Sequence, residues 1–268
     1  MGISGASLMV LVASVGSGST WWTRSNPRSV SKDTPAAAPR VLYYGRRKGK
    51  PLTTARQAVI EDHLPRLRIE LPGDGGPIDP RSLFPFPVND VWLEVGFGGG
   101  EHLAAQAAQN KNVGVIGAEV FLNGVASLVR HVVEKNLSNV RIFNDDVRHL
   151  LPSLPDQCLS RVFVLFPDPW PKARHDKRRF IGPANLDALA RQMRDGAELR
   201  VASDHPVYIH WALEQITAHP AFSWAVNGPE DWLIAPADHA TTRYEQKAKK
   251  AGRKPHFFRF YRKPRTSQ

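Results

Sequence analysis

One short segment brings together side chains that could hold a nucleobase, Phe166–Ala173 (F-P-D-P-W-P-K-A). It places the carboxylate of Asp168 between two prolines and follows it with the flat ring of Trp170. Proline fixes its own φ and restricts the residue before it, so the backbone around Asp168 is rigid. Base stacking on an aromatic ring contributes about 1–3 kcal/mol. The segment therefore indicates a nucleobase clamp, although a rigid turn with a capping aspartate would contain the same prolines.

A basic run follows this segment and could bind the phosphates of the nucleic acid to which the base belongs. Such binding depends strongly on salt and little on base sequence. The whole chain has 36 Lys and Arg against 25 Asp and Glu, a formal charge of +11 and a pI near 10.0, which favours a polyanionic partner. A solvated charged face is the simpler explanation of such a run. Its members are Lys172, Arg174, Lys177, Arg178 and Arg179.

A glycine-rich loop follows an apolar run and could receive a cofactor. Gly96, Gly98 and Gly100 let the backbone turn sharply and approach a ligand closely. The dinucleotide fingerprint G-x-G-x-x-G would need a glycine where this chain has Glu101. A pyrophosphate would also face the negative charges of Glu94 and Glu101. A cofactor without phosphates and with a positive amino acid group, such as S-adenosylmethionine, suits the loop better than NAD.

Two further acids follow the next two apolar runs. Glu119 comes about twenty residues after the glycines, where an acid can accept hydrogen bonds from both hydroxyls of a ribose. Asp145 lies in Asn144–Asp146, where a side chain can reach the exocyclic amine of an adenine. Each acid alone could be a helix N-cap. The glycine loop, Glu119 and Asp145 nevertheless fall at the ends of three successive predicted strands, which favours a site for S-adenosylmethionine. The residues alone leave open whether Asp145 or its neighbour Asp146 makes this contact.

Alternating strands and helices must position these side chains. Such alternation predicts an α/β fold with a parallel sheet and helices on both faces, and ligands bind beyond the carboxyl ends of such strands. Asp204 follows the fifth strand and points to the same edge. The predicted strands are Val91–Val95, Val113–Ala118, Val140–Phe143, Val162–Phe166, Leu199–Ala202 and a last strand at Phe257–Arg262. The predicted helices are Glu101–Asn110, Gly124–Asn136, with Val125, Leu128, Val129, Val132 and Val133 on one apolar stripe, Leu186–Met193 and Val207–Ala218.

The rest of the sequence narrows the class of protein. A single cysteine, Cys158, excludes an internal disulfide and a cysteine metal cluster, and the ten histidines show no ligand spacing, so no metal is predicted. The apolar stretch at residues 7–15 is shorter than the roughly 20 residues of a membrane span and lacks the positive region of a signal peptide. We predict a disordered extension at residues 1–40, one domain at residues 41–268 and a reducing, cytoplasmic location.

Together these segments resemble the bacterial tRNA (guanine-N7)-methyltransferase family. The long run that begins F-P-D-P-W is highly specific, whereas the glycine loop alone would fit many methyltransferases. The resemblance implies a Rossmann-like, class I, S-adenosylmethionine-dependent methyltransferase with a mostly parallel seven-stranded sheet and an antiparallel C-terminal strand. The matching stretches are L-E-V-G-F-G-G-G (93–100), G-A-E-V (117–120), F-P-D-P-W-P-K-A-R-H-D-K-R-R (166–179), A-S-D-H (202–205) and T-R-Y-E-Q (242–246).

The resemblance also implies an activity and a set of site residues. The family methylates N7 of the guanine at position 46 in the variable loop of tRNA. Its cofactor positions correspond to Glu94, Glu119, Asp145 and Asp168, and Asp168 is also its catalytic acid. Its substrate positions correspond to Lys172, Asp204, Thr242, Arg243, Tyr244 and Glu245, and its RNA-contacting run to Arg174, His175, Lys177, Arg178 and Arg179.

The chemistry of guanine N7 predicts what Asp168 would do. N7 carries a lone pair and no proton, so no base is needed and alignment of the reacting atoms is the main contribution. Asp168 would then orient the base and stabilise its developing positive charge. Two other functions fit in part: a methyltransferase that acts on an exocyclic amine, and a non-catalytic RNA-binding protein that keeps the fold. The expected partner is tRNA rather than a membrane, and either a monomer or a homodimer is compatible with the sequence.

Overall fold

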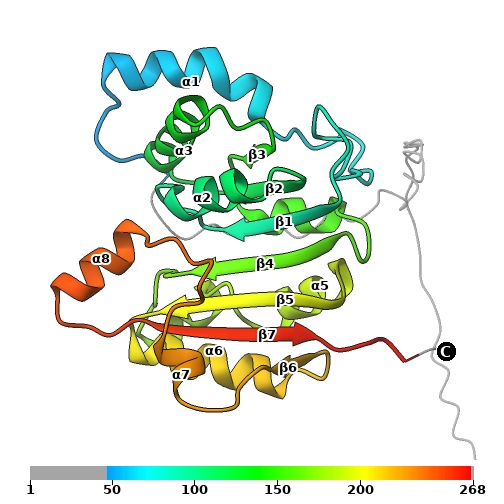
Figure 1. The fold of residues 1–268 in the computed structure, drawn as a ribbon, viewed down its shortest axis with the longest axis vertical. Helices are drawn as coiled ribbons and strands as arrows, with labels where there is room; N and C mark the ends of the chain where they lie inside the picture. The colour runs from blue at the N-terminus through cyan, green and yellow to red at the C-terminus, as the bar shows by residue number, and fades with distance from the viewer. Residues whose placement is uncertain (1–46, 267–268) are drawn as a thin grey trace, which may run out of the picture. The chain divides into compact units, whose positions relative to one another are not determined.

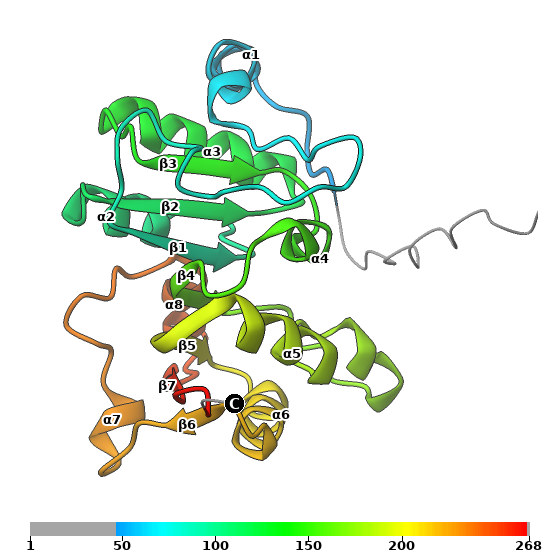
Figure 2. The same ribbon diagram turned by 90° about the vertical axis from the view of Figure 1, so that its right-hand side faces the viewer.

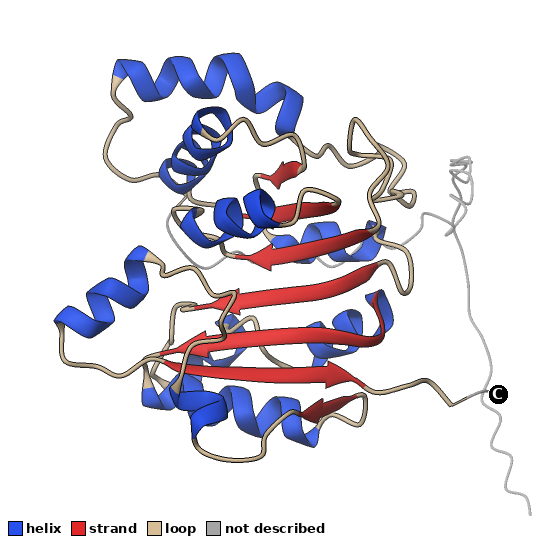
Figure 3. Ribbon diagram, in the orientation of Figure 1, coloured by secondary structure: helices blue, strands red, loops and turns tan. Residues whose placement is uncertain are grey.

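The computed structural model describes residues 47–266, and their strands join in one seven-stranded sheet (Figure 1). The disorder predicted for residues 1–40 lies outside the described residues. The strands are β1 (Asp90–Val95), β2 (Val113–Ala118), β3 (Val140–Phe143), β4 (Leu159–Leu165), β5 (Met193–Ser203), β6 (Phe222–Trp224) and β7 (His256–Arg262). The helices are α1 (Thr54–Leu67), α2 (Glu101–Gln109), α3 (Leu122–Glu134), α4 (Val147–Leu150), α5 (Pro183–Gln192), α6 (Pro206–Ala218), α7 (Glu230–Leu233) and α8 (Arg243–Lys250), with short 3₁₀ turns η1 (Leu151–Ser153) and η2 (Ala173–Arg178) (Figure 3).

The order of the strands confirms the predicted fold class. It is β3-β2-β1-β4-β5-β7-β6, and β1 pairs in parallel with both β2 and β4. β7 runs antiparallel to β5 and to β6. The chain crosses from β3 at one edge to β4 beside β1, so the direction of strand order switches between β1 and β4. Ligands of open α/β sheets bind at such a switch point, beyond the carboxyl ends of the strands.

Each strand sends alternate side chains to opposite faces of the sheet, and the two faces are covered differently. Val91 and Leu93 of β1 belong to the core shared with α4, α5 and α6, while Trp92 belongs to the core shared with α1, α2 and α3. Figure 2 shows the two groups of helices on opposite sides of the strands. Val125, Leu128, Val129 and Val132 of α3 are all at most 2% exposed, as the predicted stripe requires. Val133 is 38% exposed, so its assignment to that stripe was wrong.

The face that carries Trp92 becomes polar toward β7. Trp92 lies beside Arg161, Arg161 beside Glu198, and Glu198 beside Tyr261 on successive strands. Arg161 also stacks on Trp92, with its guanidinium carbon 4.4 Å from the ring centroid. This part of the face therefore carries charged side chains, and the segment between α7 and α8 passes over it (Figure 1).

Several elements differ from the prediction. α1 is not among the predicted helices, and it has an internal proline, Pro65, near its C-terminus. β4 begins at Leu159 rather than Val162, and β5 begins at Met193 rather than Leu199. In both cases polar residues interrupt the extra part of the strand, so only its pairing with neighbouring strands reveals it. β2 and β3 have the predicted bounds.

No helix within residues 47–266 is both long and apolar enough to traverse a bilayer. Over the same residues, no group of three or more His, Cys, Asp or Glu side chains is arranged to hold a metal ion. Cys158 is a free thiol, and burial raises its pKa to about 12. A thiol with so high a pKa is almost entirely protonated near neutral pH, so Cys158 is a poor nucleophile.

Candidate active site

The glycine loop connects β1 to α2 and has the backbone conformation that its glycines permit. Gly96, Gly98 and Gly100 have φ values of 68°, 57° and 77°, all in the left-handed region that favours glycine. A Cβ on Gly96 would meet no atom within 4 Å, so the backbone there borders open space. A Cβ on Gly98 would lie 2.6 Å from Cε2 of Tyr244. The loop is therefore uncovered at Gly96 and covered by the ring of Tyr244 at Gly98.

Glu119, at the end of β2, is fixed by this loop. Its Oε2 accepts a hydrogen bond from the amide of Gly98 at 2.8 Å, and its Oε1 accepts one from the amide of Phe121 at 2.9 Å. Burial raises the pKa of Glu119; the two backbone donors oppose this, and the charge of Asp168 adds to it. Each carboxylate oxygen keeps a second lone pair for another donor. Glu119 is therefore held in one orientation at the end of β2.

A cavity of about 140 Å³ opens beside Glu119, and the two candidate aspartates on its wall are held differently. Asp146 caps α4: its Oδ1 accepts from the Arg148 amide at 3.0 Å and its Oδ2 from Nη2 of Arg148 at 2.6 Å. Burial alone would raise the pKa of Asp146, but the hydrogen bonds from Arg148 lower it. Asp145 is more exposed, at 35% of its side chain, and contacts Arg47 at 2.9 Å and His149 at 3.2 Å.

The cavity wall combines the ends of three strands with the segment that follows η2. Its residues are Val95, Gly96, Ala118, Glu119, Val120, Asp145, Asp146, Val147, Arg148, Arg178 and Phe180.

The loop that holds Asp168 is strained on both sides of the acid. Phe166 and Trp170 have φ values of 49° and 41°, which are unusual for bulky side chains and cost about 1–3 kcal/mol each. Arg179 holds the loop from beneath: it donates from Nε to the carbonyl of Pro169 at 3.1 Å and from Nη2 to that of Trp170 at 2.8 Å. Asp168 itself is exposed. The loop therefore presents this carboxylate on a backbone that neighbouring groups keep in place.

The basic run divides into exposed and packed members. Arg179 is only 6% exposed and lies 4.7 Å from the ring centroid of Trp211, so the structure places it in the fold rather than on the surface. Arg178 lies 4.8 Å from the centroid of Trp170, and the ring of His175 lies 5.8 Å from that of Trp170. The exposed cations are Lys172, Arg174 and Lys177.

The T-R-Y-E segment begins α8, and its four residues have two different roles in the structure. Thr242 is the N-cap of α8: its Oγ1 accepts a hydrogen bond from the Glu245 amide at 3.1 Å, and both residues are buried. Arg243 faces the glycine loop instead, with its Nε 3.4 Å from Oε1 of Glu101. Burial raises the pKa of Tyr244, and the charges of Glu119, Asp168 and Glu101 raise it further. Arg243 and Tyr244 thus lie close to the acids of the site.

Two predicted site residues contact parts of the protein that the sequence did not suggest. Glu94 is 2% exposed, and its Oε2 lies 2.8 Å from Nδ1 of His102 on α2. Asp204, after β5, lies 2.5 Å from Nε of Arg253, just beyond α8. The structure therefore gathers Glu119, Asp168 and Tyr244 around the ends of β1, β2 and β4, while Glu94 lies beneath α2.

Sequence reasoning did not find the residues that support this site. Arg179 was read as an RNA contact, and nothing in the sequence shows that its guanidinium reaches the carbonyls of Pro169 and Trp170. The N-terminus of α8 could have been found, because T-x-x-E is a recognisable signature of a helix start. His102 and His239, which lie between Glu94 and Glu245, give no local signal.

The chain is similar to known methyltransferases. Residues 88–258 match a protein family described as "Putative methyltransferase". The tRNA (guanine-N(7)-)-methyltransferase of Rhodospirillum rubrum is 55% identical over 227 residues, which cover 84% of this chain and 89% of the relative. The enzyme of the same name from Paramagnetospirillum magneticum is 54% identical over 231 residues, covering 86% and 96%. The crystal structure of the 16S rRNA methyltransferase KamB has a TM-score of 0.50 at 18% identity, covering 73% of this chain and 96% of that chain, and this likeness concerns the fold alone.

Proposed function

Since the chain belongs to the bacterial tRNA (guanine-N7-)-methyltransferase family, we propose that it transfers a methyl group from S-adenosylmethionine to N7 of a guanine in tRNA. We further propose that this guanine is the one at position 46 of the variable loop. The observation that carries the proposal is the placement of Asp168. It stands at the end of β4 on a strained loop that Arg179 holds in place, with exposed cations directly after it.

The residues around the cavity fit S-adenosylmethionine. Glu119 has free lone pairs directed by its two backbone donors, which suits a ribose diol. Asp145 suits an exocyclic amine better than Asp146, because 35% of its side chain is exposed against 9% for Asp146. The bare backbone at Gly96 leaves room for close approach of a ligand. When bound, the cofactor supplies a methyl group on a positively charged sulfur. Glu94, Gly98 and Gly100 would act indirectly, by shaping the loop.

Asp168 would act on the base rather than on a proton. Guanine N7 attacks through a lone pair, so the purine gains positive charge as the new bond forms. A carboxylate held next to the ring stabilises that charge, and the rigid loop keeps it aligned before the reaction begins. Tyr244 and Arg243 would close the site from the side of α8, and Asp204 would support them through its contact with Arg253.

The exposed cations would hold the tRNA backbone. Lys172, Arg174 and Lys177 project from η2 and the residue before it, immediately after the loop of Asp168. Phosphate contacts of this kind position a nucleic acid without reading its sequence. When a base enters the site, these cations would hold the phosphates of the tRNA backbone beside it. A tRNA substrate also implies a cytoplasmic location.

The test is incubation with labelled S-adenosylmethionine and bulk tRNA, followed by chemical cleavage at 7-methylguanine. We expect label in tRNA and cleavage at position 46 of the variable loop. A transcript with adenine at that position is the matched control and should take up no label. Label on an exocyclic amine, or no transfer despite binding of the cofactor, would refute the proposal.

A further inference from the structure

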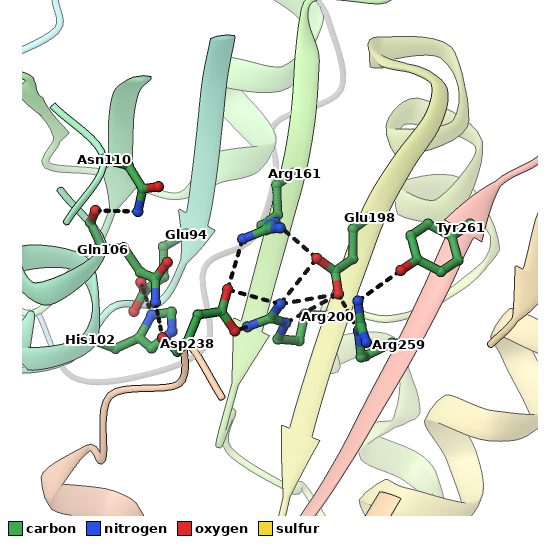
Figure 4. A network of polar contacts seen from close by, with 10 residues as sticks. All are labelled: Glu94, His102, Gln106, Asn110, Arg161, Glu198, Arg200, Asp238, Arg259 and Tyr261. Carbon is green, nitrogen blue, oxygen red and sulfur yellow. Dashed lines mark hydrogen bonds and ion pairs between the residues drawn. The ribbon is translucent and has the colours of Figure 1, made fainter. Parts of the chain in front are cut away.

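The segment between α7 and α8 is fastened to the polar face of the sheet by Asp238. Its Oδ1 lies 2.8 Å from Nη1 of Arg200, and its Oδ2 lies 3.0 Å from Nη1 of Arg161. Arg200 is 1% exposed and also pairs with Glu198 at 3.1 Å. Figure 4 shows Asp238 reaching these guanidinium groups from a loop outside the sheet. Gln106 of α2 donates to the backbone carbonyl of Asp238 at 2.5 Å, so the same residue is held from the sheet and from a helix.

The next residue, His239, makes a second attachment, which leads to α8. Its Nε2 lies 2.7 Å from Oε2 of Glu245, and both side chains are 1% exposed. Its ring centroid lies 5.3 Å from that of His102, which in turn contacts Glu94 at 2.8 Å. The ring of His239 packs edge-on against Phe257, with centroids 4.9 Å apart, and the ring of His102 packs edge-on against Phe163 at 4.8 Å. A buried row of Glu94, His102, His239 and Glu245 therefore joins β1 and α2 to α8.

This row fixes where Tyr244 stands. Glu245 is adjacent to Tyr244 in α8, so holding the carboxylate of Glu245 inside the protein sets the direction of the neighbouring ring. That ring covers Gly98 of the loop that binds Glu119. The other carboxylate oxygen of Glu245, Oε1, forms an ion pair with Nζ of Lys249 at 2.7 Å. Glu245, although part of the T-R-Y-E segment, thus has its carboxylate turned away from the open site.

We propose that His239 and Glu245 are positioning residues: their docking against His102 holds α8 on the glycine loop and places Tyr244 for both the cofactor and the base. The inference rests on the proposed function only in naming those two ligands. The docking predicts that α8 (Arg243–Lys250) behaves as a movable arm, which can lie on the glycine loop or move away from it. The cofactor site is complete only in the docked state.

The hydrogen-bond partners of the two histidines are consistent with the docked state. Nε2 of His102 and Nδ1 of His239 have no hydrogen-bond partner among residues 47–266. For His239 this pattern fits a neutral ring, in which Nε2 donates to Oε2 of Glu245 and Nδ1 is left bare. Burial lowers the pKa of His239, outweighing the hydrogen bond to Glu245. The charged or titratable groups that face it are His102, Glu94, Glu245, Lys249 and Arg200.

The test uses the full-length protein and measures release of the arm directly. Trypsin can cut α8 and the turn after it at Lys247, Lys249, Lys250 and Arg253, once they leave the docked helix. We expect His239→Ala to be cut there about tenfold faster and to bind S-adenosylmethionine about tenfold more weakly, the effect of one hydrogen bond to a charged group. His239→Gln keeps an amide donor for Glu245 and should recover most of both losses.

The matched control removes another pair of histidine and carboxylate. His219 lies 3.1 Å from Asp187, between the end of α6 and α5, so Asp187→Asn should leave both the cutting rate and the affinity unchanged. Unchanged cutting in His239→Ala would overturn the inference. A lower melting temperature with unaltered affinity for S-adenosylmethionine would also overturn it, because that pattern marks a merely structural residue. Faster cutting of α8 in His239→Ala would support the docking whether or not the wild-type protein methylates tRNA. Failure of the wild-type protein to methylate tRNA would refute the proposed function alone.

Discussion

Replacement of Gly98 by alanine tests whether Tyr244 is held against the glycine loop. Gly98 has a φ of 57°, and alanine in the left-handed region costs about 1–2 kcal/mol. The new Cβ would lie 2.6 Å from Cε2 of Tyr244, whereas ordinary contact begins at 3.4 Å, so the ring would have to retreat by about 0.8 Å. Overpacking of this kind costs about 1–3 kcal/mol. We therefore expect Gly98→Ala to cost about 2–5 kcal/mol in total, unless Tyr244 leaves the loop.

Gly196→Ala is the matched control for the backbone. Gly196 has a φ of 76°, and a Cβ there would meet no atom within 4 Å, so this variant should show the left-handed cost alone. Thermal unfolding and binding of S-adenosylmethionine are then measured for both variants, with roughly 2–4 °C expected for each kcal/mol. The excess loss in Gly98→Ala should disappear when Tyr244→Ala is added, because the clash partner is gone.

Two outcomes would refute this reasoning. Equal losses of stability and of cofactor affinity in Gly98→Ala and Gly196→Ala would show that Tyr244 does not lie on the loop. An excess loss that persists in the Gly98→Ala, Tyr244→Ala double variant would show that the new methyl group meets something else.

Four further expectations follow from the same geometry. Asp168→Asn should lose most of its turnover and keep its affinity for S-adenosylmethionine by calorimetry; near-normal turnover would contradict a charge-stabilising role. Arg179→Lys keeps the charge but cannot reach two carbonyls, so chemical denaturation should show about 1.5–3 kcal/mol less stability. Burial lowers the pKa of His239 in the folded protein, so the unfolded chain takes up a proton at a higher pH. The free energy of unfolding should therefore fall as the pH drops below about 6.5. The difference in this free energy between wild type and His239→Gln should narrow below that pH and stay constant above it. Lys177→Ala should weaken tRNA binding and make the slope of log affinity against log salt shallower by about 0.7–0.9, and an unchanged slope would exclude a phosphate contact.

The alternating core of the fold was predictable because its signals are local. β2 and β3 are short apolar runs bounded by polar residues, and their predicted bounds are those observed. The glycine loop and Glu119 were placed correctly at the ends of successive strands, since parallel strands bring their carboxyl ends to one edge of the sheet. Each of these inferences needed only neighbouring residues and one rule of topology.

The parts that sequence reasoning missed depend on partners far along the chain. The first half of β5 contains Arg194, Asp195 and Gly196, which read as a turn until Glu198 and Arg200 find partners on β4, β7 and the Asp238 segment. α8 is strongly basic, and its docking depends on the burial of Glu245 against His239. Arg179 stands in the same basic run as its exposed neighbours, so only its hydrogen bonds to the carbonyls of Pro169 and Trp170 distinguish it from them. In each case the decisive contact joins residues that no sequence window contains.

The place of β7 in the sheet sets an order of assembly on the ribosome. β7 is synthesised after the other six described strands, yet it lies between β5 and β6, and among these strands β6 pairs with β7 alone. A nascent chain can therefore pair β1 through β5 early, while β5 remains an open edge and β6 waits for its neighbour. α8 lies between β6 and β7 in the chain, so its arm is anchored at both ends only when β7 inserts. The half that carries Glu119 and Asp168 can thus form before Tyr244 has a fixed position, and a chain released too early would lack the closing half of its site.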